Sequence, residues 1–179
     1  MFVKGMDLSF VDEIEAGGGA YYDGGTRRDP LELMVEAGMN AVRLRIWHDP
    51  PGGFCNLERT LVMARRIREL GLHFLLDFHY SDGWADPSKQ WKPRAWEGLD
   101  LSGLRGAVHR YTAEVLSALN AQGTPPDMVQ VGNEVTPGML WPEGRVDGEY
   151  DTEEQWRAFA ELLQAGAAAV RAVCPHARV

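Results

Sequence analysis

One stretch of sequence, His73-Phe74-Leu75-Leu76-Asp77-Phe78-His79, decides the predicted fold class. Side chains of a β-strand point alternately to the two faces of a sheet, so the apolar residues at positions 74, 76 and 78 share one face. Asp77 and His79 share the opposite face. We therefore predict a buried strand whose apolar face packs on helices and whose other face carries polar groups.

The same succession of a short apolar run, a loop and a helical pattern occurs four times along the chain. The candidate strands are Phe2–Asp7, Asn40–Trp47, His73–His79 and Met128–Glu134. The candidate helices are Pro30–Ala37, Leu57–Leu70, Leu101–Ala121 and Glu153–Val173. Strands that alternate with helices predict an α/β fold with a parallel sheet and crossover helices.

The connections between these elements differ in length. Turns from helix to strand are short, and glycines at positions 38, 71 and 123 suit the left-handed residue that ends a helix. Connections from strand to helix are long, namely Leu8–Asp29, Tyr80–Asp100 and Val135–Thr152. Active sites of α/β folds lie on such loops. The glycines at 17–19 and 24–25 lack phosphate-loop spacing, so we interpret them as a flexible loop.

Charged residues gather on the predicted inner face of the sheet. Arg43 and Arg45 alternate with apolar residues in the second strand, and Asp7 is in phase with Gly5 in the first. Buried charges are costly unless they are paired or hydrogen-bonded. These residues, with Asp77 and His79, therefore form either a functional cluster at the strand ends or a structural polar network.

Glu134 ends the fourth candidate strand and could act as a general acid. Strict alternation would place only one of Asn133 and Glu134 on the inner face, so we predict a kink at this strand end. Aromatic rings suited to stacking on sugar faces follow on two loops: Tyr80, Trp84, Trp91, Trp96 and Trp141. Alternatively, some of them, Trp96 and Trp84 first, form loop core.

Composition excludes several other classes of function. The chain has 26 acidic and 18 basic residues and a net charge of -8, which argues against a nucleic-acid partner. It lacks an apolar run of about eighteen residues, so we predict no membrane helix. Residues 1–10 resemble a strand rather than a signal peptide. Cys55 and Cys174 lack metal-site spacing and are expected to be free thiols, and we predict no metal or cofactor.

Four motifs resemble the endo-β-1,4-galactanases of glycoside hydrolase family 53. The resemblance covers nearly the whole chain in order, and the stretches His-Tyr-Ser-Asp and Gly-Met-Leu-Trp-Pro are long and unusual. The motifs are Gly5-Met6-Asp7-Leu8-Ser9, Asn40-Ala41-Val42-Arg43-Leu44-Arg45, His79-Tyr80-Ser81-Asp82-Gly83-Trp84-Ala85-Asp86-Pro87 and Val131-Gly132-Asn133-Glu134-Val135-Thr136-Pro137-Gly138-Met139-Leu140-Trp141-Pro142.

The resemblance implies a (β/α)8 TIM barrel and retaining hydrolysis of β-1,4-galactan, the backbone of type I arabinogalactan. Glu134 resembles the catalytic acid/base, and Asn133 resembles the residue that holds the sugar 2-hydroxyl. Arg45 and His79 resemble residues that orient the nucleophile and the sugar. The remaining residues implied in substrate binding are Asp7, Asp86, Trp84 and Trp141, of which the two tryptophans resemble subsite walls.

Residues 1–179 supply only about four βα units, and we expect a single partial barrel. Retaining hydrolysis needs a second carboxylate about 5–5.5 Å from the first, which the family carries on a later strand. We therefore expect the isolated chain to be inactive, and to self-associate through its open sheet edge. The family resemblance favours an extracellular protein, whereas the missing leader leaves the cytoplasm open. The alternatives are a related β-glycanase acting on mannan or cellulose, and a non-catalytic galactan-binding half-barrel.

Overall fold

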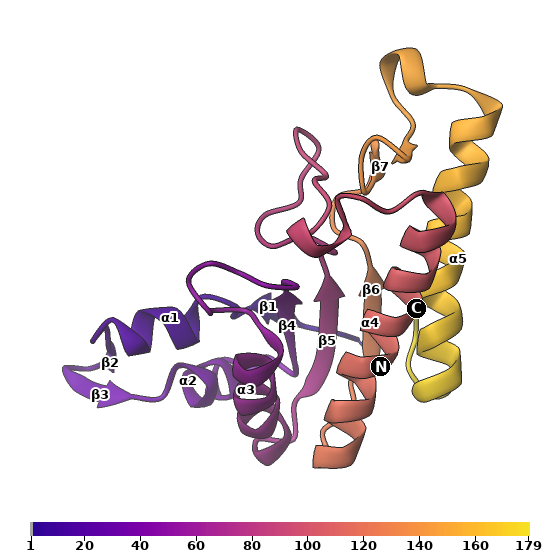
Figure 1. Cartoon of the computed structure of the whole chain (residues 1–179). Coiled ribbons are helices and arrows are strands. Elements are labelled where there is room, and N and C mark those ends of the chain that lie inside the picture. The colour runs from indigo at the N-terminus through magenta and orange to yellow at the C-terminus, as the bar shows by residue number, and fades with distance from the viewer. Residues whose placement is uncertain (1) are drawn as a thin grey trace.

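The structure, a computed structural model, describes residues 2–179. Its centre is a sheet of four strands in the order β1-β4-β5-β6, in which all neighbours are parallel (Figure 1). The strands are β1 (Gly5–Asp7), β4 (Ala41–Ile46), β5 (His73–Phe78) and β6 (Met128–Val131). They confirm the four predicted strands, each one to three residues shorter at one or both ends.

Helices cover one face of this sheet (Figure 1). The four predicted helices are confirmed as α2 (Pro30–Glu36), α3 (Leu57–Glu69), α4 (Leu101–Gln122) and α5 (Glu153–Val173). Side-chain oxygens cap their first turns: Asp29 accepts from the Leu31 amide at 2.7 Å, and Thr152 accepts from the Gln155 amide at 3.2 Å. Such a cap typically contributes about 1 kcal/mol, so the local sequence fixes where each helix begins.

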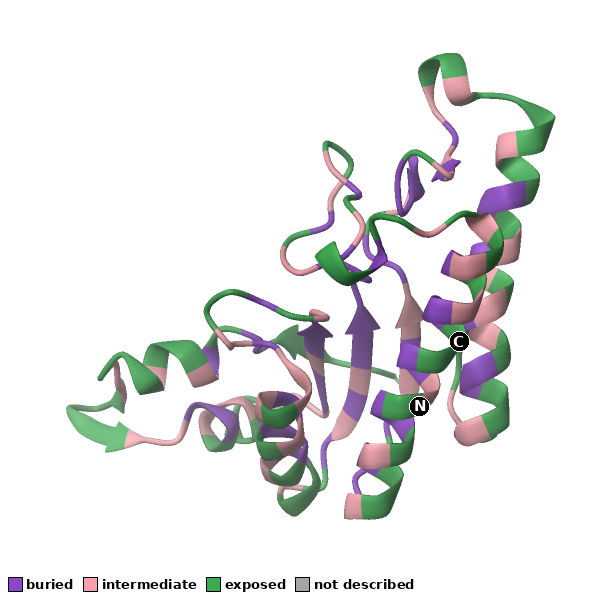
Figure 2. Ribbon diagram, in the orientation of Figure 1, coloured by how far each residue is buried: buried purple, intermediate pink, exposed green. Residues whose placement is uncertain are grey.

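The apolar core lies between the helices and the face of the sheet that they cover. The alternation predicted for β4 and β5 is confirmed, because Val42, Leu44, Ile46, Phe74, Leu76 and Phe78 join the apolar core, whereas Arg43 and Asp77 pair with each other on the other face. Figure 2 colours most of both strands as buried. The apolar residues pack against the buried stripe of α4, which includes Leu104, Val108 and Val115. Full burial of a large apolar side chain contributes about 1.5–3 kcal/mol, so each of these residues stabilises the packing of the helices on the sheet.

The first strand-to-helix connection corrects a prediction. Residues 8–29 are not a loop throughout, because they form α1 (Val11–Ala16) and an antiparallel hairpin of β2 (Tyr21–Asp23) and β3 (Thr26–Arg28). Gly24 and Gly25 have φ of 52° and 80° and make the two-residue turn of that hairpin. Two successive left-handed residues are what such a turn requires, so the flexible-loop interpretation of these glycines was wrong.

No helix or strand of the described residues covers the other face of the sheet. A groove of about 210 Å³ runs along it, lined by residues of all four strands that include Gly5, Arg43, Leu75 and Met128. Within residues 2–179, the one further partner of β6 is a single bridge from Met128 to Arg178. The loops above the sheet contain one small strand pair, β7 (Gly138–Met139) with β8 (Gly144–Arg145), and two 3-10 turns, at Arg94–Trp96 and Gly148–Tyr150.

None of the helices between residues 2 and 179 has the length and apolar character needed to cross a membrane.

Candidate active site

A polar network joins all four strands at their carboxyl ends. Arg43 on β4 contacts the Asp7 carboxylate on β1, and its Nη2 lies 2.6 Å from Asp77 Oδ2 on β5. The same nitrogen donates to Asn133 Oδ1, just beyond β6, at 2.8 Å. Asp77 is fully buried, so this pairing is what makes its charge tolerable inside the fold. Of the two sequence interpretations, the structural network therefore describes Arg43 and Asp77.

The network also sets the pKa of Asp7. Partial burial acts to raise it, but hydrogen bonds from the Ser9 side chain and amide, together with Arg43, outweigh burial and hold the pKa below its ordinary value. Asp7 therefore stays ionised and paired with Arg43. Its predicted contact with substrate stays a prediction.

His79 is buried and held in one tautomer. Its Nδ1 accepts hydrogen bonds from Trp47 Nε1 at 3.2 Å and from the Ala85 amide at 3.1 Å. The ring proton therefore sits on Nε2, which lies 3.0 Å from Asp77 Oδ2 without the alignment of a hydrogen bond. The imidazole is thus fixed in orientation at the strand end.

Arg45 lies two residues beyond Arg43 on the same face but in a different environment. It is 2% exposed, and its Nε and Nη2 have no hydrogen-bond partner within residues 2–179. Its guanidinium carbon lies 4.0 Å, 4.4 Å and 4.8 Å from the ring centroids of Phe10, Trp84 and Trp47. Aromatic faces stabilise a cation without satisfying its N–H groups. Arg45 is thus the member of this cluster with donors left for a ligand.

The chain kinks after β6, as predicted from the alternation. Gly132 and Glu134 have φ of 88° and 48°, and a side chain at position 132 would approach Val135 Cγ1 to 2.6 Å. Asn133 turns inward, where it is 5% exposed and its Nδ2 donates to the Ala85 carbonyl at 2.7 Å. Glu134 is exposed, and its carboxylate makes no hydrogen bond or ion pair to the described residues. The kink therefore gives two neighbouring side chains separate roles.

A left-handed glutamate costs about 1–2 kcal/mol, so other contacts must hold the kink. Gln90, which is 2% exposed, supplies them: its Nε2 donates to the Asn133 carbonyl at 2.8 Å and lies 3.4 Å from the Glu134 carbonyl. Gln90 was not among the predicted site residues, because nothing in a loop glutamine signals a contact with a residue 43 positions away.

The aromatic residues divide into core and surface. Tyr80 and Trp96 are buried in the main core, which confirms the loop-core alternative for Trp96, whereas Trp84 and Trp91 are 43% and 59% exposed. Trp141 is only 7% exposed, since Arg145 stacks on its ring at 4.4 Å and Trp91 meets it edge-on at 5.7 Å. The role of Trp141 as a subsite wall stays a prediction, and the more exposed indole of this pair belongs to Trp91.

Asp86 organises the third loop. Its Oδ1 accepts from the Ser88 hydroxyl and amide at 2.5 Å and 2.8 Å, and its Oδ2 lies 3.3 Å from Lys89 Nζ. The hydrogen bonds from Ser88 lower the pKa of Asp86. A substrate contact by Asp86 stays a prediction, since its carboxylate is already engaged in this turn.

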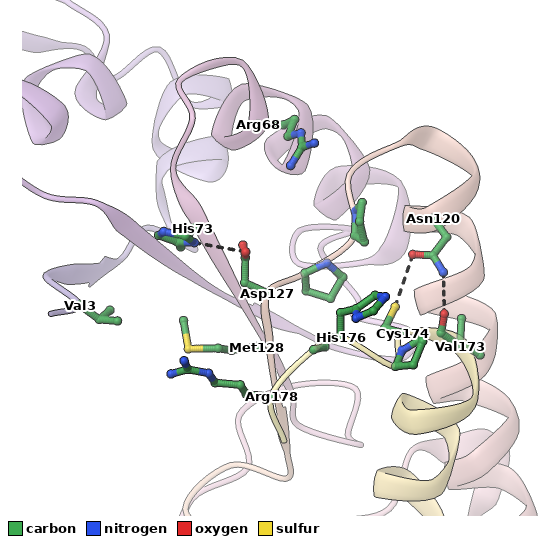
Figure 3. A pocket seen from close by; sticks show the side chains of 14 residues that line it. Val3, Arg68, His73, Asn120, Asp127, Met128, Val173, Cys174, His176 and Arg178 are labelled. Atoms are coloured by element: carbon green, nitrogen blue, oxygen red, sulfur yellow. Dashed lines mark hydrogen bonds and ion pairs between the residues drawn. The ribbon is translucent and has the colours of Figure 1, made fainter. Parts of the chain in front are cut away.

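A second pocket, of about 420 Å³, lies at the opposite end of the sheet (Figure 3). His73 and Asp127, which stand at the amino ends of β5 and β6, pair there at 3.2 Å. Cys174 Sγ lies 3.4 Å from Asn120 Oδ1 nearby, and both cysteines of the chain are free and buried, as expected. The length of the strands separates this pocket from Glu134.

The carboxyl strand ends of this parallel β/α sheet bring together an exposed carboxylate, a buried arginine and exposed indoles. Polar side chains gathered at that end are typical of β/α-barrel enzymes. The chain belongs to glycosyl hydrolase family 53, whose family model matches residues 3–179. The predicted family and the partial-barrel fold are thereby confirmed.

Three relatives illustrate the relationship. An uncharacterized protein in the bgaB 5′ region of Niallia circulans is 61% identical over 96% of this chain and 48% of its own length. An arabinogalactan endo-β-1,4-galactanase of Cellvibrio japonicus is 38% identical over 95% of this chain and 45% of its own length. The solved GH53 catalytic domain of Ignisphaera aggregans is 41% identical, with a TM-score of 0.90 over 98% of this chain and 49% of that domain. The chain thus spans about half the length of the relatives it matches.

Proposed function

We propose that this chain forms the acid/base half of a retaining endo-β-1,4-galactanase, with Glu134 as the proton donor. The observation that carries the proposal is the kink after β6, which exposes Glu134 while Asn133 stays locked to Arg43. The galactanase name of several relatives supports β-1,4-galactan as the substrate. Such a polysaccharide is met outside the cell, so we also propose an extracellular site of action.

In this mechanism Glu134 gives its proton to the glycosidic oxygen as the bond to the sugar C1 breaks. A second carboxylate attacks C1, and Glu134 then takes a proton from the water that releases the sugar. Arg45 is placed to orient that second carboxylate, since a buried guanidinium with open donors binds a carboxylate strongly. Asn133 keeps one N–H of its amide for the sugar 2-hydroxyl, because its hydrogen bond to Ala85 uses the other.

The second carboxylate belongs, in this proposal, to the strands that complete the barrel. The 179-residue chain expressed by itself should therefore release no sugar from galactan, and its uncovered sheet face and edge should make it self-associate. A monodisperse monomer in light scattering would contradict the self-association.

The experiment joins residues 1–179 to the half of the Ignisphaera aggregans domain that this chain does not cover, so that the barrel closes. We expect reducing ends to be released from β-1,4-galactan, and Glu134→Gln to lower kcat/KM by about 10²–10⁴-fold. Glu149→Gln is the matched control, because Glu149 is an exposed carboxylate on the same loop and takes no part in the contacts that hold Gln90. It should stay within a few-fold of the parent.

The outcome also separates the alternatives. Hydrolysis of mannan or cellulose in preference to galactan would assign a different β-glycanase. Galactan binding in calorimetry without release of sugar from the joined protein would point to a binding module. Full activity of Glu134→Gln would refute the acid/base role.

A further inference from the structure

Gln90 occupies an unusual position between the two functional loops. Its side chain is 2% exposed, and its Nε2 faces three backbone carbonyls, those of Asn133 at 2.8 Å and of Glu134 and Asp86 at 3.4 Å. Successive carbonyls of an extended strand point to opposite sides, so two neighbours cannot turn toward one donor in that conformation. The convergence of the Asn133 and Glu134 carbonyls therefore belongs to the kinked backbone alone.

Gln90 is itself held in place by the fourth loop. Its carbonyl accepts from the Trp141 amide at 2.8 Å, and the next residue, Trp91, forms a bridge and an edge-on ring contact with Trp141. Lys92 follows and pairs with both carboxylate oxygens of Glu143, at 2.8 Å and 2.9 Å. Three successive residues of the third loop thus contact the fourth loop and fix the position of Gln90. If the kink after β6 relaxed, the Gln90 side-chain amide could not move with the backbone of Asn133 and Glu134.

We propose that Gln90 is a positioning residue for Glu134, holding the backbone in the left-handed conformation that aims the carboxylate at the substrate. This rests on the proposed role of Glu134. Asn133 is anchored separately by Arg43 and Ala85, so loss of the Gln90 amide displaces the glutamate rather than the asparagine. Gln90 acts through the backbone and does not touch the reacting atoms.

The first test compares Gln90→Met with Gln122→Met in the joined enzyme. Methionine keeps the length of the side chain and removes the donor. Displacement of a reacting group by about 1 Å can cost about 10²-fold, so we expect Gln90→Met to lower kcat by about 10–100-fold with KM within about threefold. Gln122 is the matched control: its Nε2 also donates to a backbone carbonyl, that of Leu61 at 2.8 Å, but away from the site. Gln122→Met should leave kcat within about twofold.

A pH signature distinguishes positioning from a general loss of stability. In Gln90→Glu the introduced carboxylate repels the two carbonyls, but its protonated form can donate an O–H to the Asn133 carbonyl. Burial favours that neutral form. The activity of Gln90→Glu relative to the parent should therefore rise as the pH falls, whereas the relative activity of Gln90→Met should not change. Equal, flat pH profiles for the two variants would overturn the inference.

Crystal structures of the parent and Gln90→Met decide the claim independently of activity. We expect Glu134 to leave its left-handed conformation in the variant, and a retained φ near 48° would overturn the inference. The proposed function fails in a different way, namely if Glu134→Gln hydrolyses galactan normally. The crystal structures therefore test the positioning role of Gln90 even if the acid/base assignment of Glu134 is wrong.

Discussion

The two ends of the parallel sheet are built from different backbone conformations. Four non-glycine residues within residues 2–179 have a positive φ, and all lie in connections that leave the carboxyl ends of strands: Cys55, Tyr80, Glu134 and Leu140. The turns that enter the amino ends use glycine instead, at positions 38, 71 and 123. Left-handed backbone costs a non-glycine residue about 1–2 kcal/mol and costs glycine little. Strain is thus concentrated at the end that carries the candidate site, where packing and hydrogen bonds must offset it.

The largest expected difference between the two ends concerns buried charge. Asp77 is fully buried between Arg43 and His79, whereas Asp127 at the amino end is 48% exposed beside His73. Asp77→Ala removes the buried negative charge that pairs with Arg43 and should lower the free energy of unfolding by about 3–5 kcal/mol. Asp127→Ala should lower it by about 1 kcal/mol. Urea unfolding of both variants measures the difference, and equal losses would break the comparison.

A smaller effect on stability is expected when alanine replaces a glycine at each end of the sheet, where one glycine is required by tight packing and the other by its backbone conformation. A side chain at Gly166 on α5 would lie 2.5 Å from Val131 Cγ1 and 2.9 Å from the Tyr80 hydroxyl, near the carboxyl end. Gly71 at the amino end has φ of 65° and open space around it. Gly166→Ala should cost about 1–3 kcal/mol through overpacking, and Gly71→Ala about 1 kcal/mol through its backbone. Thermal unfolding of the two variants should rank them in this order, and a larger loss for Gly71→Ala would contradict it.

Most of the sheet could be predicted because its signals are local. Alternation in residues 73–79 assigns each side chain to a face, and Asp29 and Thr152 mark helix starts by bonds to amides within three residues. The kink after β6 was also predictable, because alternation cannot place two adjacent residues on the same face. The structure of the first connection was not predicted, because α1 has only six residues. Gly24 and Gly25 of this connection suit a flexible loop and a hairpin turn equally.

The details of the site depend on contacts that no local pattern encodes. Trp141 was expected to line a sugar subsite, and no local pattern shows that Arg145 covers its ring. The role of Gln90 depends on the carbonyls of Asn133 and Glu134, which turn toward it only because the chain kinks after β6. Sequence could therefore identify which residues gather at the strand ends, but not which of them are already engaged by their neighbours.

The smallest expected effect is a pH dependence that belongs to the carboxyl end. The pKa of Asp7 is held below its ordinary value of 3.8 in the folded chain, by Ser9 and Arg43 against the opposing effect of burial. A carboxyl group with a lowered folded pKa contributes stability that is present above its unfolded pKa and is lost as the pH falls through the folded value. The free energy of unfolding should therefore decrease more steeply below about pH 4 in the parent than in Asp7→Asn.

The matched control for that measurement is Asp147→Asn. The pKa of Asp147 is also lowered, first by its hydrogen bond from Arg145, but this pair lies on an exposed loop and is screened by solvent. The free energy of unfolding of both variants is measured by urea unfolding between about pH 5 and about pH 2.5. This range extends on the order of a unit either side of the ordinary carboxyl pKa. Asp147→Asn should keep the acid slope of the parent, because only the Asp7 pair connects, through Arg43, to the buried Asp77 and Asn133 of the network that joins the four strands. If Asp7→Asn kept the parental slope as well, the carboxyl end would hold its charges no more tightly than an exposed loop does, and the contrast between the two ends would rest on backbone strain alone.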